Sequence, residues 1–529
     1  MNNNIQILDC TLRDGGYVND FHFGRYAIGK IISQLTESGI DVVECGFLED
    51  GEYNADESLF QTVEQISQFI PANRKHSLYV AMACYGEYDI AQLTPFDGSS
   101  IDGIRVSFHH NEIAEGIRFC HQVKEKGYKI FIQPVGTTSY TKDQLLFLIQ
   151  QVNELNPYAL YFVDTLGLMH KEDVLRFYNF IDQHLSPTIR LGFHSHNNLQ
   201  LSFSNCQALI HHVSGRTLLL DASVYGMGRA AGNLNTELIT NYLNEHISRR
   251  YEIEPILEIV DEFILRIREN FSWGYSVPYY LAAINGCHPN YATYLSGKQT
   301  LTVRNISAIL RMIEPDKRSL FDKNLAENKY LEFQSRKIDD REAVIQLEQV
   351  IADRNVMLLA PGPTTSTYHN EICRTIAAND CISISVGFVP DDIDCDFTFL
   401  SNLKRYNTIF NEKPLQSRLI HTSNIRIEQQ DKIVLDYSSL LNESDDIIDN
   451  SAMMALNLLT KLHPKKVFLA GLDGYKYGEA NYAQADLRQE QDKDRFEKLN
   501  KAIRDRISEL KEKLIIEFVT PSLYNDRPL

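Results

Sequence analysis

The sequence predicts an α/β protein with an N-terminal (β/α)8 TIM barrel, a helical extension and a smaller C-terminal α/β three-layer domain. Over roughly the first 230 residues, eight short apolar segments alternate with helix-sized amphipathic segments, which is the pattern of a barrel. Several of the eight are almost continuously apolar, as expected for parallel strands buried on both faces. An open doubly wound sheet is the alternative, but the GxGxxG turn typical of its first strand is absent.

The barrel strands are expected in chain order, with a helix between most of them. The predicted strands are Ile5–Leu8, Asp41–Cys45, Leu78–Ala83, Gly103–Phe108, Lys129–Pro134, Ala159–Asp164, Arg190–His194 and Leu218–Ser223. The clearest predicted helices are Gly24–Ser38, Ile113–Lys126, Lys142–Asn153 and Lys171–His184.

A glycine-containing loop, Gly226–Glu237, follows the eighth predicted strand, and glycine permits close approach of the backbone to a ligand. Residues 238–271 and 301–353 are helical in pattern. We therefore predict a barrel over residues 1–295, a helical extension or linker over 296–353 and an α/β domain over 354–529. The strands expected in that last domain are Val356–Ala360, Cys381–Val386, Phe397–Leu400, Thr408–Phe410, Lys432–Leu435, Val467–Ala470 and Leu514–Val519.

Composition narrows the class of protein. The chain has 529 residues, 43% hydrophobic and 23% charged, with a formal net charge of −18, which disfavours a nucleic-acid partner. It contains no apolar run long enough to span a membrane and no secretory signal pattern. Nine cysteines without a CxxC pair indicate reduced thiols. We expect a cytoplasmic protein with small-molecule substrates, assembled as a homo-oligomer.

Polar residues stand where the predicted barrel strands end. Because the active sites of barrels lie at the carboxyl ends of the strands, these residues should share one rim. They are Arg13 and Asp14, Glu44, Arg105, Gln133, Asp164 with Thr165, His194 with His196, and Asp221 with Ser223.

The two histidines suggest a metal site. Residues two apart on a strand point to the same side, so His194 and His196 should present both imidazoles together, and Asp14 can complete the set. One carboxylate with two imidazoles and no thiolate favours Mn²⁺ or Mg²⁺, with Zn²⁺ as a further candidate. The alternative is that HxH is a coincidence of two surface histidines.

Four ordered motifs resemble the DRE-TIM metallolyases, a superfamily that includes HMG-CoA lyase, 4-hydroxy-2-oxovalerate aldolase and isopropylmalate synthase. The motifs are TLRDG after the first predicted strand, DTxG after the sixth, HxHN on the seventh and GxGxxxGN…TE after the eighth. The resemblance covers about residues 5–295. It implies that Asp14, His194 and His196 bind a divalent metal, with Asn233 near it. It further implies that Arg13 steadies an enolate and that Glu44 supports Arg13.

The general base departs from that pattern. In the hydroxy-oxovalerate aldolases a histidine follows LRDG by two residues, and here that position is Tyr17. The candidates are Tyr17, His22, His288 and Tyr291. We prefer His288, since the synthases of the superfamily use a histidine from beyond the barrel and imidazole suits this role near neutral pH. A structural histidine and a packed loop tyrosine are the alternatives for His288 and Tyr17.

Several residues are expected to contact the substrate. Arg105, Gln133 and Ser107 should point into the barrel mouth or interior, and an internal salt bridge is the alternative role for Arg105. Asp164 and Tyr291 complete the predicted substrate contacts. The Gly226–Gly232 loop lacks the cysteine of HMG-CoA lyases, which argues against that activity.

The C-terminal domain carries a weaker signal. Its Ala360–Thr364 loop and its Leu472-Asp473-Gly474 turn resemble a sialyltransferase-like group of bacterial surface-glycan proteins. Gly362, Thr364 and Asp473 are then candidate nucleotide-binding residues, with a strand-ending turn that binds nothing as the alternative.

Together these features predict a metal-dependent aldolase or lyase that acts on a 2-oxo acid such as pyruvate and on an aldehyde or sugar, in surface-glycan synthesis. One alternative is a Claisen-type synthase using an acyl-CoA. Another is a bifunctional enzyme whose C-terminal domain binds or transfers a nucleotide-activated sugar. In a further alternative, that domain serves only as a scaffold.

Overall fold

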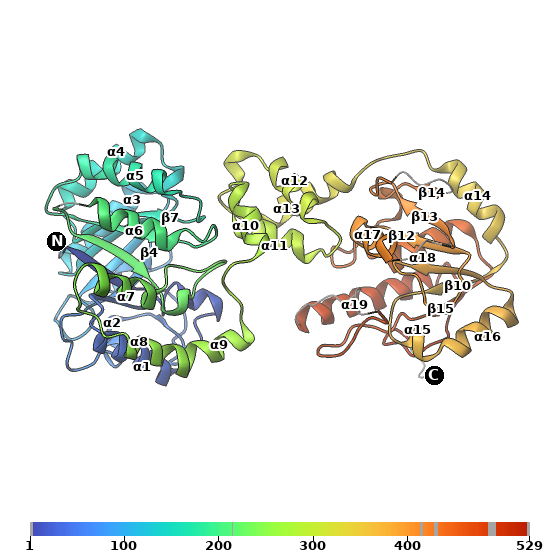
Figure 1. Cartoon of the computed structure of the whole chain (residues 1–529), viewed down its shortest axis with the longest axis horizontal. Helices are drawn as coiled ribbons and strands as arrows, with labels where there is room; N and C mark the ends of the chain where they lie inside the picture. Colours follow the sequence, from blue (N-terminus) through green and yellow to red (C-terminus); the bar gives the residue numbers. More distant parts are fainter. Residues whose placement is uncertain (1–3, 214, 413–415, 428–431, 485–492, 526–529) are drawn as a thin grey trace. The chain divides into compact units, whose positions relative to one another are not determined.

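The computed structural model describes residues 4–213, 215–412, 416–427, 432–484 and 493–525. The chain divides into two compact units, of which the first comprises residues 1–293 and 314–321 and the second 294–313 and 322–529. Each contains one parallel sheet (Figure 1). Within the described ranges, every helix is too short or too polar to cross a lipid bilayer.

The first unit is a closed (β/α)8 barrel. Its strands are neighbours in chain order, and pairing of Leu8 with Val42 joins the first strand to the second and closes the ring. The barrel strands are β1 (Ile5–Asp9), β2 (Val42–Leu48), β4 (Leu78–Cys84), β5 (Gly103–Phe108), β6 (Lys129–Pro134), β7 (Ala159–Asp164), β8 (Arg190–Ser195) and β9 (Leu218–Ala222). All eight predicted barrel strands are confirmed, and a two-residue strand, β3 (Leu59–Phe60), extends the sheet beside β2.

Helices cover the outside of the barrel, as their apolar faces require. They are α1 (Arg25–Glu37), α2 (Val63–Ser67), α3 (Ile113–Glu125), α4 (Lys142–Leu155), α5 (Lys171–His184), α6 (Ser202–His212) and α7 (Thr236–His246). Between β4 and β5 only a short 3-10 turn, Ile90–Gln92, is present. The predicted helical stretch after the barrel is α8 (Glu254–Ile259), a π-helical turn (Val260–Ile264) and α9 (Leu265–Asn270).

The barrel interior separates into an apolar part and a polar part. Alternate strand residues such as Leu8, Val80, Phe131 and Leu219 form a cluster inside the ring. Gly192 on β8 belongs to this layer, because a Cβ there would lie 2.3 Å from the Tyr161 ring. The same alternation places charged residues further along the strands, directly beneath the carboxyl-end rim.

The residues after the barrel are mostly helical. The helices are α10 (Val277–Ile284), α11 (Pro289–Gly297), α12 (Val303–Met312), α13 (Lys323–Gln334) and α14 (Arg341–Ile351). The residues predicted as one extension are shared between the two units, with 294–313 in the second and 314–321 in the first.

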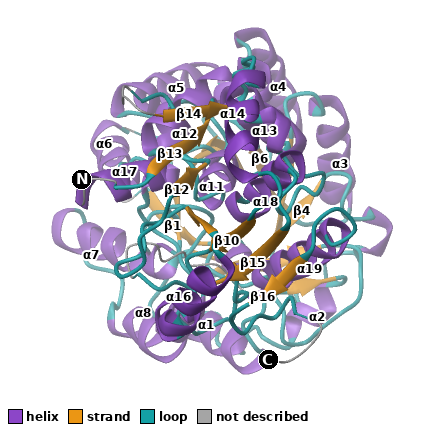
Figure 2. Cartoon of the chain, turned by 90° about the vertical axis from the view of Figure 1, so that its right-hand side faces the viewer, coloured by secondary structure: helices purple, strands orange, loops and turns teal. Residues whose placement is uncertain are grey.

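The second unit contains a seven-stranded parallel sheet in the order β14-β13-β12-β11-β10-β15-β16 (Figure 2). Its strands are β10 (Asn355–Leu359), β11 (Ile382–Val386), β12 (Phe397–Leu400), β13 (Arg418–Thr422), β14 (Lys432–Leu435), β15 (Lys466–Ala470) and β16 (Ile516–Phe518). The remaining helices are α15 (Thr364–Thr367), α16 (His369–Asn379), α17 (Leu403–Glu412), α18 (Ser451–Leu462) and α19 (Lys493–Leu510).

Helices lie on both faces of this sheet. Val356 and Leu358 pack with residues of α14, α18 and α19, whereas their neighbours Met357 and Leu359 pack with α16. A strand sends alternate side chains to opposite faces, so these two clusters define three layers. The predicted C-terminal α/β domain is therefore confirmed in its fold class.

Two predicted details of this sheet are wrong. The predicted strand Thr408–Phe410 lies inside helix α17, whose Leu403, Tyr406 and Ile409 share one apolar cluster at helical spacing. The strand Arg418–Thr422, which pairs with β12 and β14, was not predicted.

Candidate functional site

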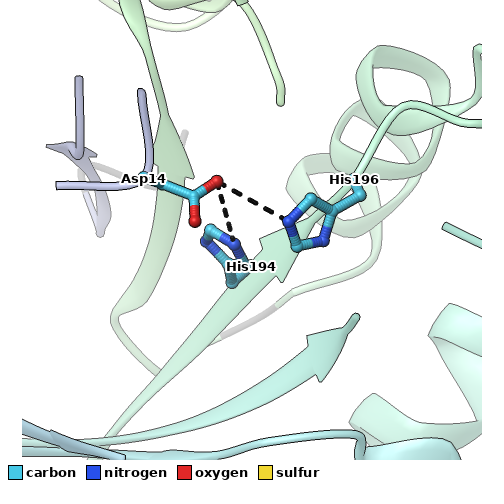
Figure 3. Close-up of side chains that lie close together, drawn as sticks. All are labelled: Asp14, His194 and His196. Carbon is cyan, nitrogen blue, oxygen red and sulfur yellow. Dashed lines mark ion pairs between the residues drawn. The ribbon is translucent and has the colours of Figure 1, made fainter. Parts of the chain in front are cut away.

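Asp14, His194 and His196 converge at the carboxyl-end rim of the barrel (Figure 3). Asp14 Oδ2 lies 4.0 Å from His194 Nε2 and 3.6 Å from His196 Nε2. One potential ligand atom from each residue lies within 4.8 Å of the other two. Asp14 and His194 are buried and His196 is nearly so, which shields the three groups from bulk water.

The backbone brings these side chains together from distant parts of the chain. Strand β1 ends at Asp9, earlier than Arg13 and Asp14, which lie in a turn whose N–H groups donate to the carbonyl of Cys10. His194 is on β8, and His196 follows the strand, where it bridges to Asn233 of the glycine loop.

Both imidazoles are oriented by their other nitrogen. His194 Nδ1 lies 2.9 Å from Asp221 Oδ2, and His196 Nδ1 lies 3.1 Å from the backbone carbonyl of Asp164. Since these oxygens accept a hydrogen bond, each ring carries a hydrogen on Nδ1 and turns Nε2 toward Asp14. This arrangement is typical of histidines that bind metals.

The charge states also suit a cation. Burial alone would raise the pKa of Asp14, but Arg13 and the two histidines outweigh it and hold this pKa well below its usual range. Burial lowers the pKa of His194, which favours the neutral ring that a metal ligand needs. For His196 burial is again the largest single influence and lowers the pKa, but the hydrogen bond and charge of Asp14, together with Asp164, outweigh it and raise this pKa overall. A bound cation in place of that proton would satisfy the same carboxylate.

Asn233 provides an independent test of the fit to a metal. Its Nδ2 donates to Asp14 Oδ2 at 2.6 Å and to the carbonyl of Met227 at 3.1 Å. Its Oδ1 is buried and has no hydrogen-bond partner among the described residues. A buried amide oxygen without a donor is costly, and a cation beside Asp14 would satisfy it. The nitrogen and oxygen donors present therefore fit a divalent ion such as Mn²⁺, Mg²⁺ or Zn²⁺.

Arg13 lies beside this cluster. Its Nη1 donates to Asp14 Oδ1 at 2.6 Å, and its Nε donates to Glu44 Oε2 at 2.9 Å. Its Nη2 is buried and has no hydrogen-bond partner in the part of the chain that the structure describes. Two nitrogens of the guanidinium are thus held by protein carboxylates, while the third remains available to an oxygen of a bound molecule.

Arg105 is completely buried beneath the rim and forms an internal ion-pair network. It donates to Glu44 at 2.8 Å and also to Asp221 and Gln133. These contacts use the guanidinium within the protein, as in the alternative of an internal salt bridge, and contact of Arg105 and Gln133 with a substrate stays a prediction. Ser107 donates to Cys84 Sγ at 3.0 Å.

Asp164 and Tyr291, which are also predicted as substrate contacts, both form hydrogen bonds with the protein backbone. The Asp164 carboxylate accepts the backbone N–H groups of Leu168 and Met169 and so shapes the loop after β7. Tyr291 is buried, and its hydroxyl donates to the carbonyls of Lys317 and Leu320.

The structure separates the candidates for the general base. Burial raises the pKa of Tyr17 to about 12, so its hydroxyl stays protonated at neutral pH and is a poor base. His22 is largely exposed and lies 3.2 Å from Glu57. Burial, followed by Arg229 and His196, lowers the pKa of His288 to about 4, so this ring is neutral at pH 7 and lies within the electrostatic influence of His196.

Two of the three C-terminal candidates line a pocket of about 170 Å³ in the second unit. Gly362 and Asp473 contribute to its wall, at the carboxyl ends of β10 and β15, where the strand order of the sheet reverses. Thr364 is held by Asp473, which accepts its backbone N–H at 2.9 Å and also its hydroxyl. Such a reversal point is the usual ligand site of an open parallel sheet.

The barrel site includes two further residues. Asp221 is predicted at the rim from its place on the eighth strand, but its contacts with His194 and Arg105 are not predicted. Arg229 lies in the Gly226–Glu237 loop, with its guanidinium carbon 3.3 Å from the centroid of the Tyr17 ring. No sequence pattern indicated that pairing.

Known proteins resemble the barrel at low identity. Residues 4–261 match the HMGL-like family. An oxaloacetate decarboxylase from Mycobacterium tuberculosis is 24% identical over 44% of this chain and 68% of its own length. A 4-hydroxy-2-oxovalerate aldolase from Geobacillus genomosp. 3 is 27% identical over 45% and 70% respectively. A homocitrate synthase from Pyrococcus horikoshii is 26% identical over 48% and 69%.

Proposed function

We propose that the HMGL-like barrel of this chain is a divalent-metal-dependent aldolase that makes or breaks a carbon–carbon bond next to a 2-oxo acid of the pyruvate type. The observation that carries the proposal is the Asp14, His194 and His196 cluster with the unpartnered Nη2 of Arg13 beside it. A divalent ion held there supplies Lewis-acid polarisation of the 2-oxo group.

The chemistry named by the relatives supports a shared enolate. Cleavage of a 4-hydroxy-2-oxo acid and loss of CO₂ from oxaloacetate both leave an electron pair at C3 of pyruvate. In each case that pair delocalises onto the 2-oxo oxygen. Stabilising this oxygen is therefore the common requirement, and donors fixed in advance contribute most to it.

The residues of the chain divide the remaining tasks. In the condensation direction a C3 proton of pyruvate leaves to a base, and the Arg13 Nη2 group donates to the developing enolate oxygen. C3 then bonds to the aldehyde carbon, and the aldehyde oxygen gains the electron pair and a proton. Cleavage reverses each step. We assign the proton transfer to His288 and the positioning of Arg13 to Glu44.

Pyruvate proton exchange tests this function without knowledge of the aldehyde. With Mn²⁺ or Mg²⁺, the protein should exchange the C3 protons of pyruvate in D₂O, followed by NMR. Asp14→Asn and His194→Ala should lose bound metal by elemental analysis and lose exchange. Arg13→Ala should keep the metal and slow exchange by about 100-fold, as for the loss of one oxyanion donor. Exchange that is independent of the metal and of Arg13 would refute the proposal.

A His288→Gln variant tests the proton-transfer assignment separately. It should retain its metal while exchange falls by about 100-fold or more, within the contribution of general acid–base catalysis. Undiminished exchange in this variant would place the base elsewhere.

A Claisen-type synthase is the second candidate, favoured by the similarity to a homocitrate synthase. It requires an acyl-CoA as the carbon nucleophile. Release of free CoA when acetyl-CoA and a 2-oxo acid are supplied together would favour this reading over the aldolase.

For the second unit we propose a nucleotide-sugar site in the pocket that Gly362 and Asp473 line, placing the protein in surface-glycan synthesis. The location at the reversal point of the sheet supports it. Binding of UDP- and CMP-sugars to the full chain, measured by calorimetry, tests it. An Asp473→Ala variant, which removes the group that holds Thr364, should weaken that binding. A chain that binds none of them would favour the scaffold alternative.

A further inference from the structure

Arg229 differs from the other arginines of the barrel mouth. Arg13 and Arg105 are buried and paired with carboxylates, whereas Arg229 is exposed. Among the residues that the structure describes, no carboxylate forms an ion pair or hydrogen bond with it. The site therefore holds one guanidinium whose charge the protein does not neutralise.

The Tyr17 ring fixes the orientation of Arg229. Its guanidinium carbon lies 3.3 Å from the ring centroid. A cation above an aromatic face is attracted by the negative charge density of the ring. Tyr17 is itself held by edge-on contacts with Phe21 and Phe47, at centroid distances of 5.0 and 5.8 Å. Because the donors of a guanidinium lie in its plane, one stacked by its face keeps its N–H groups directed sideways, where they can pair with an anion.

The backbone places Arg229 next to the metal cluster. A Cβ on the preceding residue, Gly228, would lie 2.4 Å from Asn233 Nδ2 and 3.2 Å from Asp14 Oδ2, so this glycine permits the loop to pack directly on the site. On its other side, Arg229 contributes to lowering the pKa of His288. Arg229 thus lies at the outer edge of the site, between the loop after β1 and the segment that carries His288.

We propose that Arg229, held on Tyr17, binds the carboxylate or phosphate of an anionic aldehyde, and so selects the second substrate of the barrel. This rests on the proposed aldolase function. The buried Arg13 Nη2 group serves the 2-oxo acid near the metal ligands. A substrate that extends outward from the new carbon–carbon bond reaches Arg229 with its far end.

The assignment gives a physical role to Tyr17. Its high pKa makes it unsuitable as a base, but its ring is the surface on which Arg229 rests. A histidine there would offer a smaller and partly cationic face to the guanidinium.

Acceptor selectivity measures the role of Arg229 directly. Pyruvate and Mg²⁺ are supplied with succinic semialdehyde, glyceraldehyde 3-phosphate or butanal, and the 4-hydroxy-2-oxo products are quantified. The wild type should prefer an anionic aldehyde over butanal in kcat/KM, and the first two acceptors distinguish carboxylate from phosphate. Arg229→Ala should lower that preference by about 10- to 100-fold, as expected for a lost hydrogen bond to a charged group.

Further variants distinguish the role of the Arg229 guanidinium from that of the Tyr17 ring beneath it. Tyr17→Phe, which keeps the ring face, should retain the preference, whereas Tyr17→Leu should lose much of it. Arg118→Ala is the matched control, since Arg118 is an exposed arginine on α3, away from the barrel mouth, that pairs with Glu115. An unchanged preference in Arg229→Ala would overturn the inference.

A binding measurement keeps this result independent of the proposed reaction. Wild-type protein that fails to exchange the C3 protons of pyruvate contradicts the aldolase function. In that case, calorimetric binding of succinic semialdehyde and glyceraldehyde 3-phosphate to the Mg²⁺-loaded protein decides the role of Arg229. Weaker binding in Arg229→Ala than in Arg118→Ala supports an anion site, and equal binding refutes it.

Discussion

Asp221 orients the His194 ring so that Nε2 faces Asp14. Its Oδ2 accepts from His194 Nδ1 at 2.9 Å and also pairs with Arg105. In Asp221→Asn the amide can no longer serve both groups as an anion. We expect Mn²⁺ affinity, measured by calorimetry, to fall about 10- to 100-fold, the usual effect of removing the carboxylate behind a metal-binding histidine.

Asp182→Asn is a suitable control for Asp221→Asn. Asp182 also pairs with an arginine, Arg216, but on the helical exterior of the barrel. Its loss should leave Mn²⁺ affinity unchanged. Equal affinities in the wild type and Asp221→Asn would show that His194 is oriented by other contacts.

At the scale of single residues, the sequence predicts the candidate metal-binding side chains better than the side chains that orient them. The HxH spacing on a strand and the LRDG turn pointed to His194, His196 and Asp14, because local geometry alone aligns such residues. The role of Arg105 could not be read in the same way. Its partners Glu44, Gln133 and Asp221 come from three other strands, so the choice between an internal salt bridge and a substrate contact depends on the register of the whole ring.

At the scale of elements, Asp9 ties the end of β1 to the start of α7. Its carboxylate accepts the Thr11 N–H at 2.9 Å and the Thr236 hydroxyl at 2.6 Å. Burial nevertheless raises its pKa from 3.8 to about 6. The folded state therefore binds a proton more readily than the unfolded state, and this group makes the protein less stable as pH rises from about 4 through 6.

An Asp9→Asn variant isolates this effect. The asparagine removes the buried charge. The difference in free energy of unfolding between the variant and the wild type should therefore change between pH 7 and pH 4, in favour of the wild type at the lower pH. For a pKa shift of this size the change is on the order of 3 kcal/mol. Urea unfolding of both proteins across this range measures the difference. A gap that is constant with pH would show that Asp9 titrates alike in the folded and unfolded chains.

Strands that are buried on both faces were predicted more accurately than the others. The barrel strands are covered on both faces and read as continuous apolar runs, so all eight were recognisable. In the second unit the run Thr408-Ile409-Phe410 was mistaken for a strand because a short apolar run fits a buried helix equally well. The strand Arg418–Thr422 was missed because Arg418 and His421 interrupt its apolar residues.

At the scale of the whole molecule, the location of each candidate site depends on whether its parallel sheet is closed or open. The ring gathers polar side chains from all sides onto one rim, so the motif order along the chain was enough to locate the barrel site. The open sheet has a favoured position only where its strand order reverses. The sequence could not supply that order, since it depends on which strands become neighbours.

The ion-pair network around Arg105 also affects the order in which substrates can bind to the barrel and leave it. It closes the ring beneath the metal ligands, with apolar side chains below it, so molecules reach the deepest position only through the rim. A 2-oxo acid that lies against Arg13 must then enter before an aldehyde held at Arg229, and must depart after it. We therefore expect compulsory-order kinetics of cleavage. Pyruvate should inhibit competitively against the hydroxy-oxo acid, and the aldehyde should inhibit noncompetitively. The opposite pattern would require a second entrance to the barrel interior.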